Sequence, residues 1–333
     1  MFSLWQLPLL AATILYQAIA CRQENKRKPP GKLIDVGGHR LHLLHLPSLD
    51  PHIQRKPTVV IDHSLGGVEG YLFIKQIAKH AEVCLCDRAG YGWSEVSKRA
   101  PTSEESVRSL DIALTKADIK PPYILIGNSL GSYNMRLYAH RFPEKVHGMV
   151  LTDGLHEKAL LNMPLQLRLL QSIFLSVFLI SIVGSALGFV RVAANTGIFE
   201  LIKPQLGEHY ATNLRPVVRS FYRPKHWLTM AREIAHLDHS GRQLQEANEF
   251  RKLPIVNIKA RCFFESNWLT KYLPLQSADR LREEMHTDLM ALSTRCTQLP
   301  ANNSSHFVWI DQPDVIVQAV QLLLFRTAVR APR

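Results

Sequence analysis

Short apolar runs alternate with helical stretches over much of this chain, and this alternation constrains the fold more than any other feature. Four runs have the length and apolar content of buried parallel strands: residues 58–62, 82–87, 123–127 and 146–153. Helices are expected between them, at residues 70–80, 102–118 and 130–142. Strand and helix in this order and spacing predict an α/β protein with a doubly wound, mostly parallel sheet.

The alternation is interrupted once, over residues 155–250, where the pattern is helical without an obvious strand. It resumes with strands at 253–260 and 297–299 and helices at 276–292 and 312–325. A helical cap inserted between two parts of one sheet explains the break. We therefore expect a core made of residues 31–154 and 251–333, with a cap at 155–250. Two alternating runs around Gly37 and Gly38 predict an antiparallel hairpin at the start of the core.

The N-terminus contains no charged residue from position 2 to position 20. Several basic residues then follow: Arg22, Lys26, Arg27 and Lys28. Nineteen uncharged residues are just enough to cross a bilayer, and cations after them favour an anchor at 1–21 with the body in the cytoplasm. Residues 18–20 also read A-x-A, so a cleaved signal and a secreted or periplasmic product are the alternative. A buried segment is a third interpretation, and residues 22–30 are expected to be a linker.

A second uncharged stretch runs from Ser172 to Val190. It has the length of a membrane span. We favour a cap helix that is apolar all round, packed over a hydrophobic site or resting on lipid.

Ser129 lies in the sequence Gly127-Asn128-Ser129-Leu130-Gly131. G-x-S-x-G is a common pattern by composition alone, so its surroundings decide its meaning. Here an apolar strand precedes the serine and a helix follows it at once, as a nucleophile on a strand-to-helix turn requires. We therefore interpret Ser129 as a nucleophile rather than a structural serine.

His306 is the candidate base, because it follows the last short strand in a loop of small residues and so lies at the carboxyl edge of the sheet. Asp153 ends a strand at the same edge, and Glu265 follows a later strand. Either carboxylate is suited to orient an imidazole. Asp153 is preferred, since it ends its strand directly, and capping of a following helix is its structural alternative.

An oxyanion hole requires two backbone donors. We expect them to be the N–H groups of Leu130, which follows the nucleophile, and of Leu65, in the loop after residues 58–62. Gly66 and Gly67 allow this loop a close approach.

Three motifs of the chain resemble the capped, esterase-like and peptidase-like serine-hydrolase branch of the α/β-hydrolase superfamily. They are DRAGYGWS at 87–94, GNSLG at 127–131 and HFVWIDQP at 306–313. The resemblance covers residues 31–153 and 253–328. It implies that Ser129 attacks an acyl carbon while His306 takes and returns the proton. Water then releases the acyl group, with no metal or cofactor.

The chain departs from this family at three points. Ser64 follows His63 where the family usually has His-Gly, and Asn128 stands where a histidine usually precedes the nucleophile. No aspartate follows the strand at 254–260, although some members carry the acid after the earlier strand, as Asp153 does here. The turn that contains Arg88 is generally structural.

Composition excludes several other classes of protein. The net charge of +12 is spread along a chain without an RNA-recognition, zinc-finger, helix-turn-helix or Walker motif, so no nucleic-acid partner is expected. A generally basic surface is favoured, with attraction to anionic lipid as its main rival. The five cysteines fit no zinc or C-x-x-C spacing, and no metal is expected.

The sequence thus predicts a membrane-associated serine hydrolase for an ester, thioester or amide with a small apolar acyl part. The departures from the family pattern leave two alternatives. One is a non-catalytic binding protein that uses the pocket as a receptor, and the other is an acyltransferase that uses the same triad.

Overall fold

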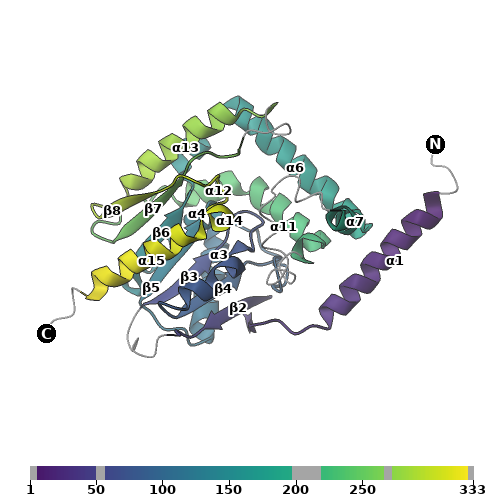
Figure 1. Cartoon of the computed structure of the whole chain (residues 1–333), viewed down its shortest axis with the longest axis horizontal. Coiled ribbons are helices and arrows are strands. Elements are labelled where there is room, and N and C mark those ends of the chain that lie inside the picture. Colours follow the sequence, from purple (N-terminus) through teal and green to yellow (C-terminus); the bar gives the residue numbers. More distant parts are fainter. Residues whose placement is uncertain (1–5, 50–56, 197–218, 266–271, 329–333) are drawn as a thin grey trace.

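The computed structural model describes residues 6–49, 57–196, 219–265 and 272–328 (Figure 1). Eight strands form one sheet in the order β1-β2-β4-β3-β5-β6-β7-β8. Their bounds are Lys32–Asp35 (β1), Arg40–Leu46 (β2), Thr58–Asp62 (β3), Val83–Asp87 (β4), Tyr123–Asn128 (β5), Val146–Thr152 (β6), Ile255–Ala260 (β7) and Cys296–Ala301 (β8). Strand β2 is antiparallel to β1 and β4, and the other pairs from β4 to β8 are parallel. The predicted mostly parallel α/β sheet is confirmed.

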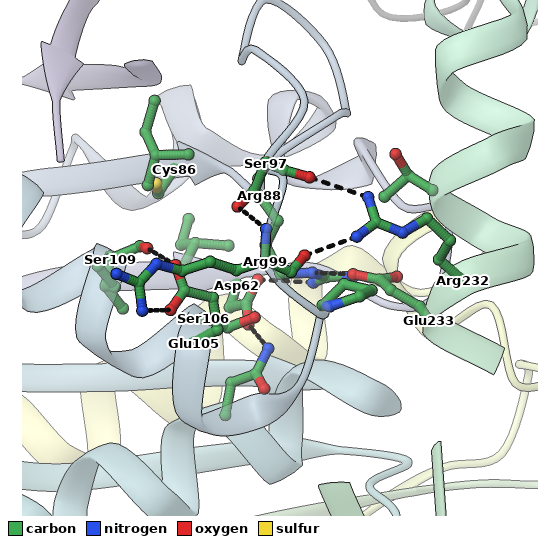
Figure 2. A pocket seen from close by; sticks show the side chains of 17 residues that line it. Asp62, Cys86, Arg88, Ser97, Arg99, Glu105, Ser106, Ser109, Arg232 and Glu233 are labelled. Carbon is green, nitrogen blue, oxygen red and sulfur yellow. Dashed lines mark hydrogen bonds and ion pairs between the residues drawn. The ribbon is translucent and has the colours of Figure 1, made fainter. Parts of the chain in front are cut away.

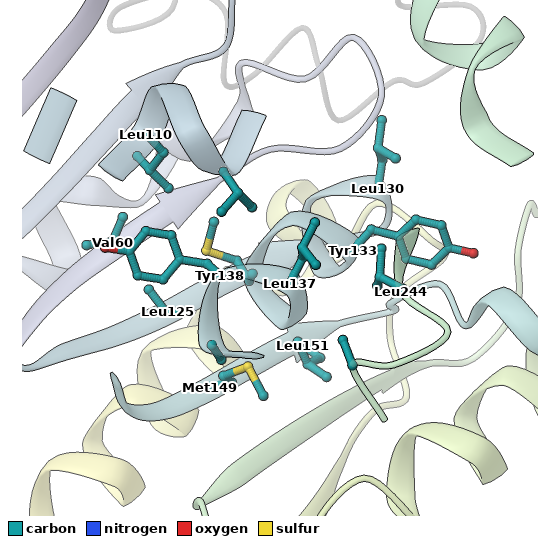
Figure 3. Close-up of a cluster of buried hydrophobic side chains, with 14 of the residues drawn as sticks. Val60, Leu110, Leu125, Leu130, Tyr133, Leu137, Tyr138, Met149, Leu151 and Leu244 are labelled. Carbon is teal, nitrogen blue, oxygen red and sulfur yellow. The ribbon is translucent and has the colours of Figure 1, made fainter. Parts of the chain in front are cut away.

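The central strands are buried along their whole length, which explains why their sequences are continuous apolar runs rather than alternating ones. Successive residues still point to opposite faces. Val60 and Leu125 belong to the apolar cluster under α3 (Ser103–Lys116) and α4 (Leu130–Arg141), shown in Figure 3. Val59 and Ile124 belong to the cluster on the other face. Helices therefore cover both faces.

The second face is covered by α15 (Pro313–Ala328), α2 (Ile74–Ile77) and the side chains around α14 (Val308–Asp311). Helix α13 (Leu275–Met290) packs beside β7, and a short 3-10 turn, η2 (Pro143–Lys145), precedes β6. The single helix expected at residues 70–80 is wrong. The chain forms a 3-10 turn, η1 (Glu69–Leu72), and then α2, because Phe73 between them has φ −121° and ψ −3°, outside the helical region.

The described parts of residues 155–250 contain helices and no strand. These helices include α5 (Glu157–Leu161), α6 (Leu165–Ala186), α7 (Phe189–Asn195), α11 (Pro224–Ala235) and α12 (Leu237–Gln243). Helix α6 packs along α11. In Figure 1 α6, α7 and α11 lie to the right of the sheet, and residues of α6 and α11 line the same cavity as Ser129, which directly follows β5. The insertion therefore covers the edge at which the candidate site was expected.

Helix α1 (Gln6–Asn25) runs beside α7 in Figure 1 before the chain enters the β1–β2 hairpin. The expected boundary between anchor and linker, at residues 21 and 22, falls inside this helix. The hairpin turns through Gly37 and Gly38, whose φ angles of 89° and 100° suit glycine. The predicted hairpin is thus present.

Candidate active site

Ser129 is the single residue between the end of β5 and the start of α4. Its backbone has φ 48° and ψ −115°, a conformation that is strained for a residue with a side chain. Its N–H donates a hydrogen bond to the carbonyl of Thr152 at the end of β6 (3.1 Å). The sharp turn fixes the hydroxyl at the carboxyl edge of the sheet.

The glycines at either side of Ser129 are required by close backbone contacts. A Cβ on Gly127 would lie 2.5 Å from the carbonyl oxygen of Gly131, and a Cβ on Gly131 would lie 2.7 Å from that of His63. Real Cβ atoms do not approach oxygen so closely. The G-x-S-x-G pattern is therefore a consequence of how tightly α4 packs on β5 and on the loop after β3.

His306 and Asp153 meet although 153 positions separate them along the chain. The Nδ1 atom of His306 lies 2.6 Å from Oδ2 of Asp153. Asp153 directly follows β6, and His306 lies between β8 and α14. The carboxylate is fully buried, whereas the imidazole is partly accessible. An imidazole held through Nδ1 leaves Nε2 available for proton transfer.

A second histidine contacts the same carboxylate. On the other oxygen of Asp153, His286 Nε2 lies at 2.8 Å and Arg282 Nη1 at 3.2 Å, and the N–H of Ala260 donates to it at 3.1 Å. Burial alone would raise the pKa of Asp153, but the hydrogen bonds from His286 and His306 outweigh it and hold the pKa well below its ordinary value. Asp153 is therefore a stable anion at neutral pH.

The sequence reasoning missed His286 and Arg282. Both lie on the buried face of α13, which otherwise carries apolar residues such as Leu281, Met285 and Leu289. A histidine and an arginine on the apolar face of an amphipathic helix could have indicated a buried polar site, because such side chains are buried only with partners.

Glu265, the alternative acid, lies elsewhere. Its carboxylate pairs with Arg261 at 3.2 Å, and both side chains are half exposed. It does not line the cavity that contains Ser129 and His306. The geometry thus brings Asp153, and not Glu265, to the histidine.

The candidate oxyanion donors, Leu65 and Leu130, line the same cavity as Ser129. Within the described residues, neither of their backbone N–H groups donates a hydrogen bond. Gly66, the next residue of the loop, has φ 70°, and its N–H donates to the Tyr91 hydroxyl at 3.2 Å. The hydrogen bond to Tyr91 therefore fixes the loop after β3 and leaves the Leu65 N–H available to stabilise an oxyanion.

The two unusual residues near the site, Ser64 and Asn128, share one partner. Glu69 Oε1 accepts hydrogen bonds from the Ser64 N–H (3.0 Å), the Ser64 hydroxyl (2.5 Å) and the Asn128 amide (3.2 Å). Burial opposes the charge of Glu69, but His63 and Ser64 together lower its pKa. Glu69 thus ties the loop that carries Leu65 to the residue before the nucleophile, and sequence reasoning did not identify it.

The site opens into a cavity of about 380 Å³. Most of its lining residues are apolar, and the polar ones are Ser64, Ser129, Asp153, Gln171, Arg282 and His306. Helix α6 contributes Leu167, Leu170, Phe174 and Phe178, and further lining residues include Leu160, Met163, Met230, Ile234, Phe263, Leu281 and Met285. Spacings of three and four residues place the α6 side chains on one face of that helix.

A second cavity, of about 40 Å³, lies under the loop after β3 (Figure 2). Arg88 lines it and donates to Asp62 Oδ1 at 2.7 Å, the His63 carbonyl at 2.6 Å and Glu233 Oε1 at 2.9 Å. This space suits one or a few water molecules. Because Arg88 joins the loop to α11, its contacts support the loop rather than a ligand.

No group of three or more metal-ligating side chains comes together in the part of the chain that the structure describes. All five cysteines are free. Burial raises the pKa of the Cys296 thiol to about 11, which makes it a poor nucleophile at neutral pH.

Comparison with known proteins agrees with this architecture. Residues 57–179 match the family model described as alpha/beta hydrolase fold. The chain is 23% identical over 234 residues to YqjL of Bacillus subtilis, covering 70% of this chain and 69% of that protein. It is 36% identical over 122 residues to a vacuolar membrane protein of Saccharomyces cerevisiae, covering 34% of this chain but only 18% of that protein.

Solved structures of similar shape include two enzymes. The enol-lactonase of Burkholderia xenovorans has a TM-score of 0.61 at 15% identity, covering 88% of this chain and 100% of that one. The esterase EaEST of Exiguobacterium antarcticum has a TM-score of 0.61 at 10% identity, covering 89% and 99%. With its eight-stranded sheet, its elbow at Ser129 and these matches, the chain has the α/β-hydrolase fold.

Proposed function

We propose that this chain is a serine hydrolase that cleaves an ester, thioester or amide with an apolar acyl part. One observation supports the proposal above all others. Ser129, the His306–Asp153 pair, Leu65 and Leu130 all line one cavity whose other residues are mostly apolar. The similar folds of an enol-lactonase and an esterase agree with hydrolysis as the reaction class.

In this proposal the Ser129 hydroxyl attacks the acyl carbon while His306 Nε2 takes its proton. The carbonyl oxygen becomes negative in the tetrahedral intermediate, and the Leu65 and Leu130 N–H groups stabilise it. The imidazolium returns the proton to the leaving group, which departs and leaves an acyl ester on Ser129. His306 then takes a proton from water, which attacks the acyl ester and regenerates the serine.

Asp153 contributes without exchanging a proton. Its contact with Nδ1 of His306 fixes the tautomer with a free Nε2 and stabilises the imidazolium that forms in each half-reaction. The three further donors to this carboxylate keep it ionised and immobile. His306 therefore keeps the same charged partner through both half-reactions.

The cavity favours an apolar acyl chain over a polar one. At about 380 Å³ it falls within the size range of small-molecule sites. Its leucine, phenylalanine and methionine side chains offer no partner for a polar substituent, so burying one there would be costly. The leaving group is left unspecified by these contacts.

A second candidate is a binding protein that retains the fold without turnover. Glu69 supports it, since a carboxylate bonded to Ser64 places negative charge near the loop that would stabilise an oxyanion. Retention of an apolar ligand, with no turnover of any short-chain ester, is the result that this alternative predicts.

A fluorophosphonate probe tests the proposal directly. The wild-type chain is expected to be labelled, Ser129→Ala is expected to lose the label, and Ser172→Ala, at an exposed serine of α6, is expected to keep it. Labelling that persists in Ser129→Ala would overturn the assignment. Product ratios with and without added alcohol then separate a hydrolase from an acyltransferase.

Membrane association remains part of the proposal, but the expected N-terminal anchor has little support. Among the described residues, one helix is long and apolar enough to cross a bilayer, and it is α6 rather than α1. Residues 1–5 of the expected anchor lie outside the described residues. The partial similarity to a vacuolar membrane protein agrees with a membrane location.

A further inference from the structure

Helix α6 is apolar on two opposite faces, and only one of them serves the fold. The chain carries no charged residue from position 169 to position 190. The inner face buries Leu167, Leu170 and Phe178 against the cavity and α11. The outer face of α6 exposes seven apolar side chains: Leu165, Leu169, Ile173, Val177, Leu179, Ile180 and Val183. Packing explains the inner residues and leaves the outer ones without a structural role.

The hydroxyl groups on the outer face are already satisfied within the helix. Ser172 donates to the carbonyl of Arg168 at 3.0 Å, and Ser176 donates to that of Ser172 at 2.9 Å. Neither hydroxyl needs water as an acceptor. A surface of apolar side chains and internally bonded hydroxyls is compatible with a medium that offers no hydrogen-bond partners.

Helix α6 does not present its whole circumference to such a medium. Its inner face packs along α11, and Gln171 Nε2 donates to the carbonyl of Ile234 at 3.3 Å. A membrane span would have to abandon these contacts and open the cavity. A helix with one protein-bound face and one exposed apolar face instead suits the plane of a membrane interface.

Helices α7 and α1 extend the outer face of α6. Phe189 and Val192 of α7 are exposed. Helix α1 is fixed to α7 through Arg191, which donates to Gln17 at 2.7 Å and to Glu24 at 2.8 Å. Helix α1 also exposes the apolar side chains of Leu7, Leu9, Ile14, Leu15, Tyr16 and Ile19. In Figure 1 α6, α7 and α1 follow one another along one side of the molecule.

Charge identifies the partner of this surface. The end of α1 and the residues after it expose Arg22, Lys26, Arg27 and Lys28. Glu24, the one acidic residue before Asp35, is neutralised by Arg191 and Arg223. A second copy of a chain with net charge +12 would be repelled by these cations, whereas an anionic lipid surface would be attracted.

We propose that the chain docks on an anionic lipid bilayer through the outer face of α6, extended by α7 and α1, and lies in the interface without crossing it. The surface is independent of the triad. Where the proposed hydrolase function also holds, the docked chain places its acyl cavity about one helix diameter, ~10 Å, from the lipid. The substrate would then be an acyl ester drawn from the membrane.

Sedimentation with sucrose-loaded vesicles tests the docking on the full chain. The wild type is expected to sediment with phosphatidylcholine vesicles that contain phosphatidylserine, and less in high salt. Replacing both Ile173 and Ile180 with serine should weaken binding to these vesicles roughly 100-fold. Phe325→Ser removes an equally exposed apolar residue from α15 and should bind as the wild type does.

A charge variant separates the two contributions. Replacing Lys26, Arg27 and Lys28 with alanine should weaken binding roughly 100-fold on vesicles with phosphatidylserine and little on phosphatidylcholine alone. Equal unfolding midpoints exclude loss of folding as the cause. Ser129→Ala should bind as the wild type does, so docking is judged apart from turnover.

Three results would overturn the docking proposal. The first is a wild type that stays in solution with both kinds of vesicle, and the second is an isoleucine variant that sediments like the wild type. The third is a stable dimer in solution that the isoleucine variant dissociates, since the outer face of α6 would then belong to a second copy of the chain.

Discussion

The two ends of the cavity are built on different principles. At the polar end, Ser129 is held by a strained backbone turn and His306 by a 2.6 Å contact with a buried carboxylate, so each reacting group has one allowed position. At the apolar end, Phe174 and its neighbours on α6 are held mainly by side-chain packing, with one hydrogen bond from Gln171 to the carbonyl of Ile234. Under the proposed hydrolase function, the first end would carry out the chemistry and the second would select the acyl chain. Substitutions at the polar end should change kcat, and those at the apolar end should change KM.

The largest effect is expected for Ser129→Ala. Loss of the nucleophile should lower kcat for a p-nitrophenyl ester by about 10⁵-fold or more, because the oxygen that would attack the acyl carbon is removed. Steady-state hydrolysis measures it, with Ser172→Ala as the control. A residual rate within tenfold of the wild type would contradict the role of the polar end.

Asp153→Asn should lower kcat by about 10⁴-fold, since the amide favours the wrong tautomer of His306. Glu265→Gln, at the alternative acid, should leave the rate unchanged. Measuring both variants with one substrate decides between the acids. The reverse pattern would return the acid role to Glu265.

Glu69→Ala should lower kcat roughly 100-fold with little change in KM, because the loop that positions the Leu65 N–H loses its tie to Asn128. Glu69→Gln keeps the size and an acceptor oxygen, so it should recover part of the rate. A rise in kcat for Glu69→Gln would mean instead that the carboxylate opposes the oxyanion.

His286→Gln should lower kcat roughly tenfold, because Asp153 loses one of the groups that hold it. It should also raise the pKa of Asp153 toward its ordinary value of 3.8. A carboxyl whose pKa is lowered by folding adds stability above its unfolded pKa, and this stability is lost as the pH falls below that value. The gap in unfolding midpoint between wild type and variant should therefore narrow below about pH 4.

A constant gap in unfolding midpoint down to acidic pH would show that His286 acts by packing rather than through the charge of Asp153. The change in kcat alone does not distinguish these roles, whereas the pH dependence of the difference in unfolding midpoint does.

The smallest effect is expected at the apolar end. Phe174→Ala should raise KM for a long-chain ester about tenfold, since an aromatic contact with the acyl chain is lost, and should leave kcat for an acetyl ester unchanged. Ile173→Ala, one residue away on the outer face of α6, is the matched control for vesicle-free assays. Equal changes in KM for the two variants would show that the inner face of α6 does not select the acyl chain.

The sheet and the elbow were predictable because their signals are local. A buried parallel strand is a continuous apolar run, and a nucleophile on a turn needs glycine at fixed offsets, so residues 123–131 are informative by themselves. Asp153 and His306 were located because strand ends share one edge of a parallel sheet. The preference for Asp153 over Glu265 used the same argument.

The supporting residues were not predictable in this way. Glu69, Arg282 and His286 come from elements whose register against the sheet is set by tertiary packing. Nothing in the sequence near Ser64 or Asn128 indicates that one carboxylate joins them. The break at Phe73 was likewise missed, because apolar periodicity over residues 70–80 does not reveal a backbone that leaves the helix for one residue.

The shared carboxylate has a consequence for how the protein matures. Asp153 emerges from the ribosome long before either of its imidazoles, which belong to α13 and to the segment after β8. Until those segments dock, the Asp153 carboxylate would lie at the edge of the sheet without a counter-charge. Burying it at that stage would be unfavourable, so this edge of the sheet should become buried late in folding. Enzymatic activity would then appear only after the last quarter of the polypeptide has been synthesised and has packed against the sheet.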